Sequence, residues 1–186
     1  MNNSLSELTV IVVTFKTDIT LLKNCLNSID SRVKVILVEN SSSFENKNEI
    51  ESQYKNIKIV CSGSNLGYGS GNNFGLNETT TRYALILNPD VICKEDYFKI
   101  IETYINNKTD FSIIGSQYEN NKEWAPCGYF DNKKFIDFDS KENPDLLKVD
   151  WVVGCSLLID LKKFESVKIF DENFFLFFEE FDLCRQ

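Results

Sequence analysis

The sequence predicts an α/β fold in which helices flank a mostly parallel sheet. Three apolar runs, at residues 8–14, 33–38 and 83–87, lack the alternation of a half-exposed strand. Such runs are typical of strands that are covered on both faces. A stretch with apolar residues at helical spacing separates the first run from the second, so the chain begins as a β–α–β unit.

Composition narrows the range of functions. The chain has 186 residues, of which 42% are hydrophobic and 26% charged, so it is long enough to bury one core. Its net charge of −8 and the lack of any Lys/Arg cluster argue against a nucleic-acid binder, which needs a basic surface. An acidic protein that handles phosphates needs a local positive charge, and a bound metal ion would supply it.

Two residue types limit the chemistry. The chain has no histidine, which excludes His-Cys zinc sites and histidine-based triads, so a general base must be Asp, Glu, Lys, Tyr or Cys. The six cysteines are isolated and show no Cys-x-x-Cys spacing, so we expect reduced core thiols in a cytoplasmic protein. No apolar stretch approaches the ~18 residues of a membrane span, and the polar N-terminus is not that of a signal peptide.

The first half should continue as alternating helices and strands. Asp18 can cap a helix with apolar residues at helical spacing. That helix would carry Leu21, Leu22, Cys25, Leu26 and Ile29. The second strand, 33–38, runs into Glu39 and a loop of hydrogen-bonding side chains. A short helix around 47–54 and a strand at 57–61 follow.

A glycine-rich stretch follows the third strand. Residues 63–75 contain five glycines, so the backbone there must turn tightly or approach another segment closely. The spacing fits neither a dinucleotide-binding fingerprint nor a P-loop. A flexible linker is one interpretation. The aromatic Tyr68 and Phe74 and the paired amides favour the other, a packed helix start.

Residues 83–90 contain the most informative carboxylate of the chain. They form an apolar run, bounded by Pro89, that stops on Asp90, and we expect a buried strand that delivers Asp90 as its last residue to the edge of the sheet. In open α/β sheets ligands bind at the carboxyl ends of the strands, and a carboxylate there can hold a divalent cation. The alternative is a plain turn, because Asn-Pro-Asp is ordinary loop chemistry.

The second half is less regular. We expect a helix at 96–106 and strands at 111–115 and 149–159, with a bend at Gly154. Residues 117–148 show no sustained period, which is typical of a functional or a disordered loop. Their scattered aromatic residues favour a loop that covers something. Residues 170–185 interleave phenylalanines with acids. One interpretation is an amphipathic core helix with a solvated acidic face. The other is that some acids face protein, where carboxylates are costly unless paired or functional.

Taken together, the motifs resemble the family 2 glycosyltransferases, in the rhamnosyltransferase-like branch. The resemblance rests on the order and spacing of residues 10–15, 38–42, 65–73, 87–90, 151–154, 170–172 and 178–183. It implies a GT-A fold, a Rossmann-like and mostly parallel sheet flanked by helices, with a small antiparallel addition in the C-terminal half. It further implies one catalytic domain over 1–186, with a nucleotide-binding half at 1–90 and an acceptor-side half at 91–186 that is truncated at its C-terminus.

The resemblance also assigns roles to single residues. Asp90 would hold Mg²⁺ or Mn²⁺, and Glu180 would be the catalytic base, with Glu179 and Asp182 as the competing carboxylates. The residues expected to contact the substrate are Thr14, Glu39, Asn65, Gly67, Asn72, Asn88, Trp151 and Gly154. Three positions depart from the family pattern: Glu39 and Glu180 stand where Asp is usual, and Asn88 replaces the first acid of the metal motif. Burial against Phe177, Phe178 and Phe181 would raise the pKa of the base toward a useful range.

The implied activity is transfer of a sugar, with inversion, from a UDP- or dTDP-linked donor to a saccharide or lipid-linked glycan acceptor. It would serve cell-surface polysaccharide synthesis, in the cytoplasm or at the inner face of the membrane. Two alternatives stay open. The chain could be a non-catalytic module that binds nucleotide sugars, or a sugar nucleotidyltransferase, which is disfavoured because no basic glycine-rich loop follows the first strand.

Overall fold

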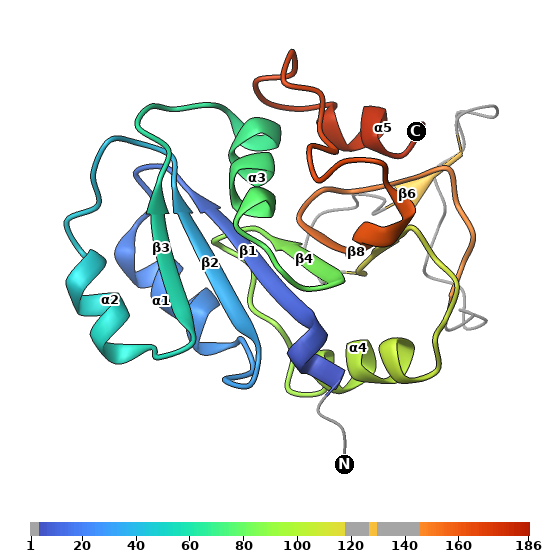
Figure 1. Ribbon diagram of the computed structural model, residues 1–186, viewed down its shortest axis with the longest axis horizontal. Coiled ribbons are helices and arrows are strands. Elements are labelled where there is room, and N and C mark those ends of the chain that lie inside the picture. Colours follow the sequence, from blue (N-terminus) through green and yellow to red (C-terminus); the bar gives the residue numbers. More distant parts are fainter. Residues whose placement is uncertain (1–3, 118–126, 130–145) are drawn as a thin grey trace.

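A six-stranded sheet organises the molecule (Figure 1). The computed structural model describes residues 4–117, 127–129 and 146–186. Across the sheet the strands are β3 (Ile57–Cys61), β2 (Lys34–Glu39), β1 (Leu8–Thr14), β4 (Tyr83–Leu87), β8 (Ser156–Asp160) and β5 (Ile113–Gly115). The first four are mutually parallel, and β8 and β5 add antiparallel pairs. The predicted mostly parallel α/β sheet is therefore confirmed.

The parallel strands are buried on both faces, as their unbroken apolar runs predict. All seven residues of β1 are buried. Val10 and Val12 point into one apolar cluster, and Ile11 and Val13 point into another on the opposite face. Successive side chains of a strand alternate between faces, so one apolar run supplies both cores.

Helices cover both faces of the sheet (Figure 1). The first cluster includes buried residues of α1 (Ile19–Asn27), α2 (Lys47–Gln53) and α4 (Tyr97–Asn106). The second includes buried residues of α3 (Tyr68–Asn77) and α5 (Glu179–Leu183). Asp18 caps α1 as expected, because its carboxylate accepts hydrogen bonds from the backbone N–H groups of Thr20 and Leu21. Leu21, one of the apolar residues expected in this helix, is 50% exposed.

The C-terminal half differs from the expected strand boundaries. The run expected as one strand at 149–159 forms β7 (Trp151–Val152), which pairs with β6 (Cys127–Gly128), and then β8 in the main sheet. The break falls at the turn that contains Gly154, where the bend was expected. β5 begins at Ile113 rather than at residue 111. The small antiparallel addition is thus confirmed, with its strands shared between two sheets.

The phenylalanine-rich segment is mostly not helical. Only Glu179–Leu183 forms a helix, α5. Phe177 and Phe178 just before it have left-handed φ angles of 70° and 71°, and their side chains are 69% and 66% exposed. A helix cannot pass through residues with positive φ. The expectation that these two rings bury the catalytic carboxylate was therefore wrong.

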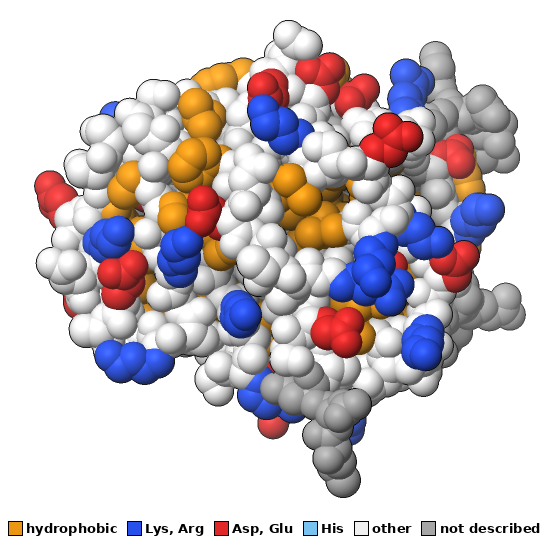
Figure 2. Space-filling model, viewed as in Figure 1, with side chains coloured by type: hydrophobic (Ala, Val, Ile, Leu, Met, Phe, Trp, Pro, Cys, Tyr) orange, Lys and Arg blue, Asp and Glu red, His pale blue; other side chains and the backbone are white. Residues whose placement is uncertain are grey.

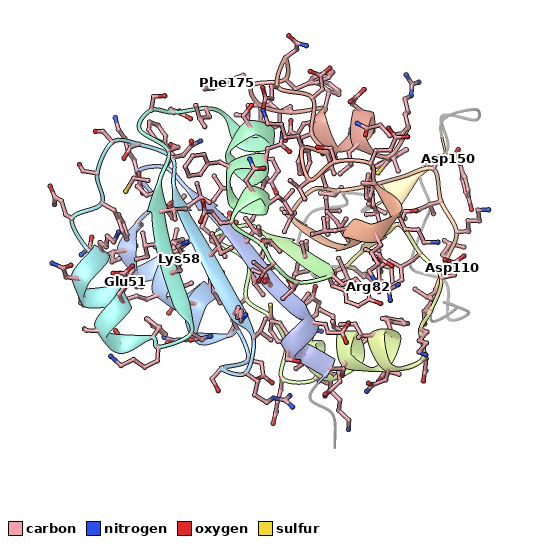
Figure 3. All side chains as sticks on the ribbon, in the orientation of Figure 1. Glu51, Lys58, Arg82, Asp110, Asp150 and Phe175 are labelled. Atoms are coloured by element: carbon pink, nitrogen blue, oxygen red, sulfur yellow. The ribbon has the colours of Figure 1, made fainter. Side chains whose placement is uncertain are left out.

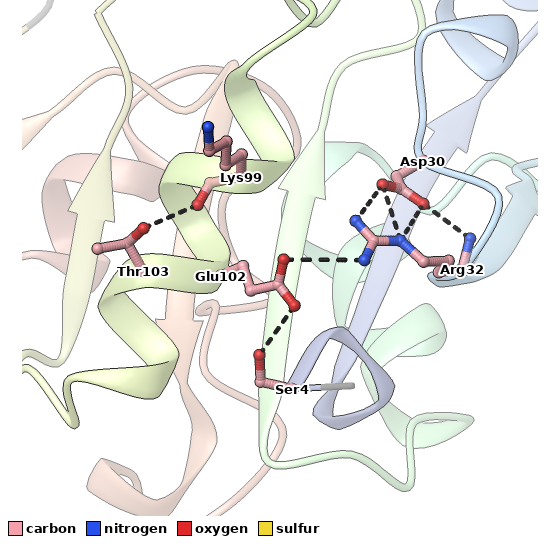
Figure 4. A network of polar contacts seen from close by, with 6 residues as sticks. All are labelled: Ser4, Asp30, Arg32, Lys99, Glu102 and Thr103. Atoms are coloured by element: carbon pink, nitrogen blue, oxygen red, sulfur yellow. Dashed lines mark hydrogen bonds and ion pairs between the residues drawn. The ribbon is translucent and has the colours of Figure 1, made fainter. Parts of the chain in front are cut away.

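Polar contacts tie the N-terminus to α4 on the side of the fold where β1 begins (Figure 4). Glu102 accepts a hydrogen bond from Ser4 Oγ at 3.3 Å and faces the Arg32 guanidinium at 3.8 Å. Arg32 also binds the Asp30 carboxylate through both Nε and Nη2. These charged side chains are partly exposed to solvent, so the contribution of their ion pairs to stability is small.

The ion pair between Arg82 and Asp160 matters more for stability, because Asp160 is buried. Asp160 at the end of β8 is 2% exposed, and Arg82 binds both of its carboxylate oxygens, at 3.0 and 2.6 Å (Figure 3). Burial alone would raise the pKa of Asp160, but hydrogen bonds from Arg82 and from the Lys162 backbone outweigh it, so the net pKa is lowered. The carboxylate therefore stays ionised inside the fold.

We expect Arg82→Met to lower the free energy of unfolding by about 2–3 kcal/mol, because it leaves a buried carboxylate without its charged partner. Since the folded-state pKa of Asp160 lies below its ordinary value of 3.8, this stabilisation is present above that pH and lost as the pH falls through the folded pKa. Urea denaturation at pH 7 and pH 3 would measure both effects. Lys58→Met, which breaks an exposed pair with Glu78, is the control, and an equal loss in both variants would contradict the expectation.

The visible surface carries both signs of charge interspersed (Figure 2). Lys and Arg side chains gather most densely right of centre, with acidic side chains beside them. Within the described residues, no helix combines the length and apolar character needed to cross a membrane. All six cysteines are free and either buried or half-buried, as expected for reduced core thiols.

Candidate active site

The carboxyl ends of the parallel strands bring the first candidate residues together. Thr14, the last residue of β1, pairs in register with Glu39, the last residue of β2. Their exposed fractions are only 2% and 4%. Burial raises the pKa of Glu39, against a hydrogen bond to Ser41 that lowers it. A buried carboxylate at this edge is suited to accept hydrogen bonds from a ligand that enters between the strand ends.

Asn40 organises the loop beside this pair. Its Nδ2 donates to Asn65 Oδ1 at 3.1 Å and to the Gly67 carbonyl at 2.9 Å. Its Oδ1 accepts from Ser62 Oγ and from the Leu66 N–H, both at 3.1 Å. One buried amide thus fixes the whole 62–67 loop. The sequence marked Asn40 only as one polar residue of a loop, because its partners lie more than twenty residues away.

The glycine-rich stretch is a packed helix start, which decides between the two interpretations. α3 begins at Tyr68 with Gly67 as its N-cap. A Cβ on Gly75 would lie 2.6 Å from Ile11 Cγ2, and one on Gly71 would lie 2.9 Å from Val13 Cγ1. The glycines let α3 approach β1 closely. Asn72 is fully buried in this helix, and its Oδ1 has no partner among the described residues.

Asn88 and Asp90 lie in the turn after β4. The strand ends at Leu87, so Asp90 is not its last residue, and its side chain is exposed. The Asn88 N–H donates to the Cys155 carbonyl at 2.9 Å. The Asn88 side-chain Oδ1 is buried and has no partner within residues 4–117, 127–129 and 146–186. An oxygen atom left unpaired beside a free carboxylate is the kind of donor set that a hard cation takes.

The turn between β7 and β8 joins this loop to the acids of α5. Glu180 lies against Gly154, since a Cβ on that glycine would be 3.5 Å from Glu180 Cβ. Burial raises the pKa of the neighbouring Cys155 thiol to about 11, and the negative charges of Asp90 and Glu180 add to the rise. The loop that carries Asp90 is tied to this turn through the Asn88 N–H, and Glu180 packs on it. The structure therefore brings the Asp90 loop and Glu180 to the same turn although ninety residues separate the two acids.

The two glutamates of α5 are differently placed. Glu179 is 5% exposed and Glu180 is half-buried, and each has a buried Oε2 without a partner in the described part of the chain. Burial raises the pKa of Glu179, and the charge of Glu180 adds to that rise. Asp182 lies near the C-terminal end, where its Oδ2 accepts a hydrogen bond from Gln186 at 3.4 Å. Glu180 is the acid of this helix that packs on the Gly154 turn.

Trp151 has a packing role in this arrangement. It is 8% exposed, and its ring lies 4.7 Å from that of Phe181, centroid to centroid. The tilted pair joins β7 to α5 and so supports the Gly154 turn and Glu180 from one side. The loop expected to cover the site, at 117–148, falls largely outside the described residues.

The donor set at the turn fits a hard divalent cation with few protein ligands. Among the residues described, no cluster of three or more Asp, Glu, Cys or His side chains could hold a metal ion by itself. Asp90 with the unpaired Asn88 oxygen nearby offers one or two oxygen ligands. Mg²⁺ is typically bound in this way, with substrate phosphates and water completing its shell.

Comparison with known proteins places these features in a family. The model of the family described as glycosyl transferase family 2 matches residues 9–179. The low-salt glycan biosynthesis hexosyltransferase Agl10 of Haloferax volcanii is 32% identical, over 97% of this chain and 61% of its own. The rhamnosyltransferase WbbL of Escherichia coli is 26% identical, over 88% of this chain and 69% of its own.

Solved structures share the architecture. S. aureus TarS 1-349 in complex with UDP superposes with a TM-score of 0.66 at 17% identity, over 95% of this chain and 53% of that one. The mannosyltransferase PcManGT of Pyrobaculum calidifontis, with GDP-Man and Mn²⁺, gives 0.61 at 12% identity, over 90% and 48%. The expected GT-A fold is thereby confirmed. The chain spans 61% of Agl10 and about half of each of these structures. With the family model matched across nearly its whole length, this chain belongs to glycosyl transferase family 2.

Proposed function

We propose that the protein transfers a sugar from a nucleoside diphosphate sugar to a hydroxyl group of a saccharide or lipid-linked glycan. The observation that carries the proposal is that Glu180 packs on Gly154 while the loop of Asp90 is tied to the next residue, since the Asn88 N–H donates to the Cys155 carbonyl at 2.9 Å, on the carboxyl edge of the parallel strands. One carboxylate is exposed and the other half-buried. Two carboxylates in such different environments can serve different roles.

The donor nucleotide would occupy the edge formed by β1, β2 and the 62–67 loop. Thr14 and Glu39 offer buried oxygen atoms to the nucleobase of the donor. Asn65 and Gly67 belong to the loop that Asn40 holds in place. Asn72 and Asn88 add amide oxygens that are unpaired among the described residues. We infer a uridine or deoxythymidine diphosphate donor, because the TarS structure shows that UDP binds the same fold.

The departing diphosphate gains negative charge, and the protein around it already has a net charge of −8. Mg²⁺ or Mn²⁺ held by Asp90, with Asn88 beside it, would supply the positive charge that stabilises the leaving group. Glu180 would accept the proton of the attacking hydroxyl on the opposite side of the anomeric carbon. Attack from that side inverts the configuration. Both halves of the chain, 1–90 and 91–186, contribute a necessary carboxylate, so we treat them as one catalytic domain.

The biological setting follows from the relatives. Agl10 is named for glycan biosynthesis and WbbL for rhamnosyl transfer. We infer a glycan acceptor and a role in cell-surface polysaccharide synthesis, with the protein in the cytoplasm or at the inner face of the membrane.

Thermal unfolding with nucleotides tests the donor site. We expect UDP or dTDP to stabilise the protein only when Mg²⁺ or Mn²⁺ is present, since the net charge of −8 disfavours an unescorted diphosphate. At a nucleotide concentration one hundredfold above Kd the gain should be about 2.7 kcal/mol, a shift of several degrees in Tm. Asp90→Ala should abolish this shift and leave the melting of the free protein unchanged.

The matched control is Asp96→Ala, which removes another exposed carboxylate that makes no capping hydrogen bond. That variant should keep the full metal-dependent shift. Equal nucleotide-dependent shifts in Tm with EDTA and with Mn²⁺ would show that nucleotide binding does not need the metal. A protein that binds nucleotide and metal but transfers no sugar to any acceptor would instead be a non-catalytic binding module.

A further inference from the structure

Tyr68 connects three segments that surround the proposed site. It is the first residue of α3. Its hydroxyl donates a hydrogen bond to the Gly154 carbonyl at 2.7 Å, and its backbone N–H donates to the Phe175 carbonyl at 2.9 Å. Figure 3 shows Phe175 beyond the end of α3 at which the helix begins. One residue of the donor-side helix thus contacts both the turn and the loop on the acceptor side.

The Gly154 turn links Tyr68 both to Glu180 and to the loop of Asn88. The site of a Cβ on Gly154 is 3.7 Å from Tyr68 Cε1 and 3.5 Å from Glu180 Cβ. The next carbonyl, that of Cys155, accepts the Asn88 N–H at 2.9 Å. Two successive carbonyl groups of one turn are therefore held by Tyr68 and by Asn88. A shift of this turn would change where Glu180 stands relative to the loop that carries Asp90.

The Tyr68 hydroxyl keeps its proton and so remains a hydrogen-bond donor. Burial raises the pKa of Tyr68 well above its ordinary value, and the negative charges of Glu179 and Glu180 raise it further. Its hydroxyl is therefore protonated near neutral pH. The hydroxyl can therefore hold the Gly154 carbonyl throughout a reaction in which neighbouring carboxylates change charge.

We propose that Tyr68 is a positioning residue whose hydroxyl, by binding the Gly154 carbonyl, sets the distance between Glu180 and the Asn88–Asp90 loop. The inference rests on the proposed function, since it assigns Glu180 and Asp90 to one reaction. The aromatic ring without its hydroxyl would not hold the Gly154 carbonyl. Its edge-to-face contact with Phe170, at 6.4 Å between centroids, would survive loss of the hydroxyl.

Tyr68→Phe isolates the hydroxyl, and Tyr54→Phe is the control. The Tyr54 hydroxyl also donates a hydrogen bond, to Asn27 Oδ1 at 2.8 Å, and its ring packs against the apolar cluster on the other face of the sheet. With the UDP- or dTDP-sugar that the wild type uses, we expect Tyr68→Phe to lower kcat roughly 10- to 100-fold, because small misplacements of reacting groups carry such costs. KM for the donor should stay within about threefold, because the ring and the 62–67 loop remain.

Amide hydrogen exchange provides a readout that needs no turnover. In Tyr68→Phe the Asn88 amide, which donates to Cys155, should exchange about tenfold faster, without a matching change in the central strands. Tyr54→Phe should leave kcat within about twofold and the protection of the Asn88 amide as in wild type.

The outcomes separate the inference from the function on which it rests. If the wild type transfers no sugar, the proposed function fails, and the Asn88 exchange rates alone then decide whether Tyr68 holds the turn. If the wild type is active and the two tyrosine variants lose kcat equally, or Asn88 exchange is unchanged in Tyr68→Phe, the positioning role is overturned.

Discussion

Replacing Glu180 by Gln is expected to lower the rate of sugar transfer by roughly 10²- to 10⁴-fold, the usual contribution of a general base. The side chain keeps its size and its packing against Gly154, so the fold and the nucleotide site should survive. Nucleotide-dependent thermal shifts with Mn²⁺ should equal those of the wild type. The measurement is kcat at saturating donor together with the thermal shift.

Neighbouring acids provide the controls for this assignment. Glu172→Gln changes an exposed acid outside the site and should leave kcat unaltered. Asp182→Asn should have a small effect, because its carboxylate accepts from Gln186 rather than facing the Gly154 turn. Glu179→Gln removes a buried carboxyl whose pKa is raised mainly by burial, so it should change stability more than kcat. A large loss of transfer in Glu179→Gln or Asp182→Asn, with activity kept in Glu180→Gln, would move the base to that residue.

Replacing Gly67 by Ala is expected to lower the free energy of unfolding by about 3 kcal/mol. Gly67 has φ 84° and ψ −177°, a combination that only glycine adopts readily. A Cβ there would also lie 2.1 Å from the Phe175 carbonyl oxygen, which accepts the Tyr68 N–H. The methyl group must therefore push the Phe175 loop away from α3. Urea denaturation would measure the loss, and nucleotide affinity should fall with it, because the Gly67 carbonyl also binds Asn40.

Gly63→Ala separates backbone strain from the clash. Gly63 has a similar φ of 88°, but no atom lies within 4 Å of its Cβ position. This control should cost only about 1 kcal/mol, the price of a left-handed alanine. Equal destabilisation in the two variants would show that backbone conformation alone matters and that the Phe175 contact contributes nothing.

The sequence alone indicated the fold class and the positions of the central parallel strands. Strand burial and helix spacing are periodic properties of short segments, so the apolar runs located β1 and β2 to within a residue and also the start of β4. The same local reading placed the glycine-rich start of α3 and the carboxylate after β4. It failed where periodicity ends: residues 149–159 were expected as one strand, and the phenylalanines before α5 were expected to shield a carboxylate.

Only the tertiary structure decided how the candidate residues meet. Tyr68 and Gly154 are 86 residues apart, and Asn73 holds the Phe170 backbone from 97 residues away, donating to its carbonyl at 2.8 Å and accepting its N–H at 3.1 Å. Such contacts depend on the order in which strands join the sheet, which no local period encodes. The antiparallel return of β8 beside β4 carries the Gly154 turn to the carboxyl edge. For that reason Glu180 lies near the loop of Asp90, and Tyr68 and Asn40 become visible as residues that hold the site together.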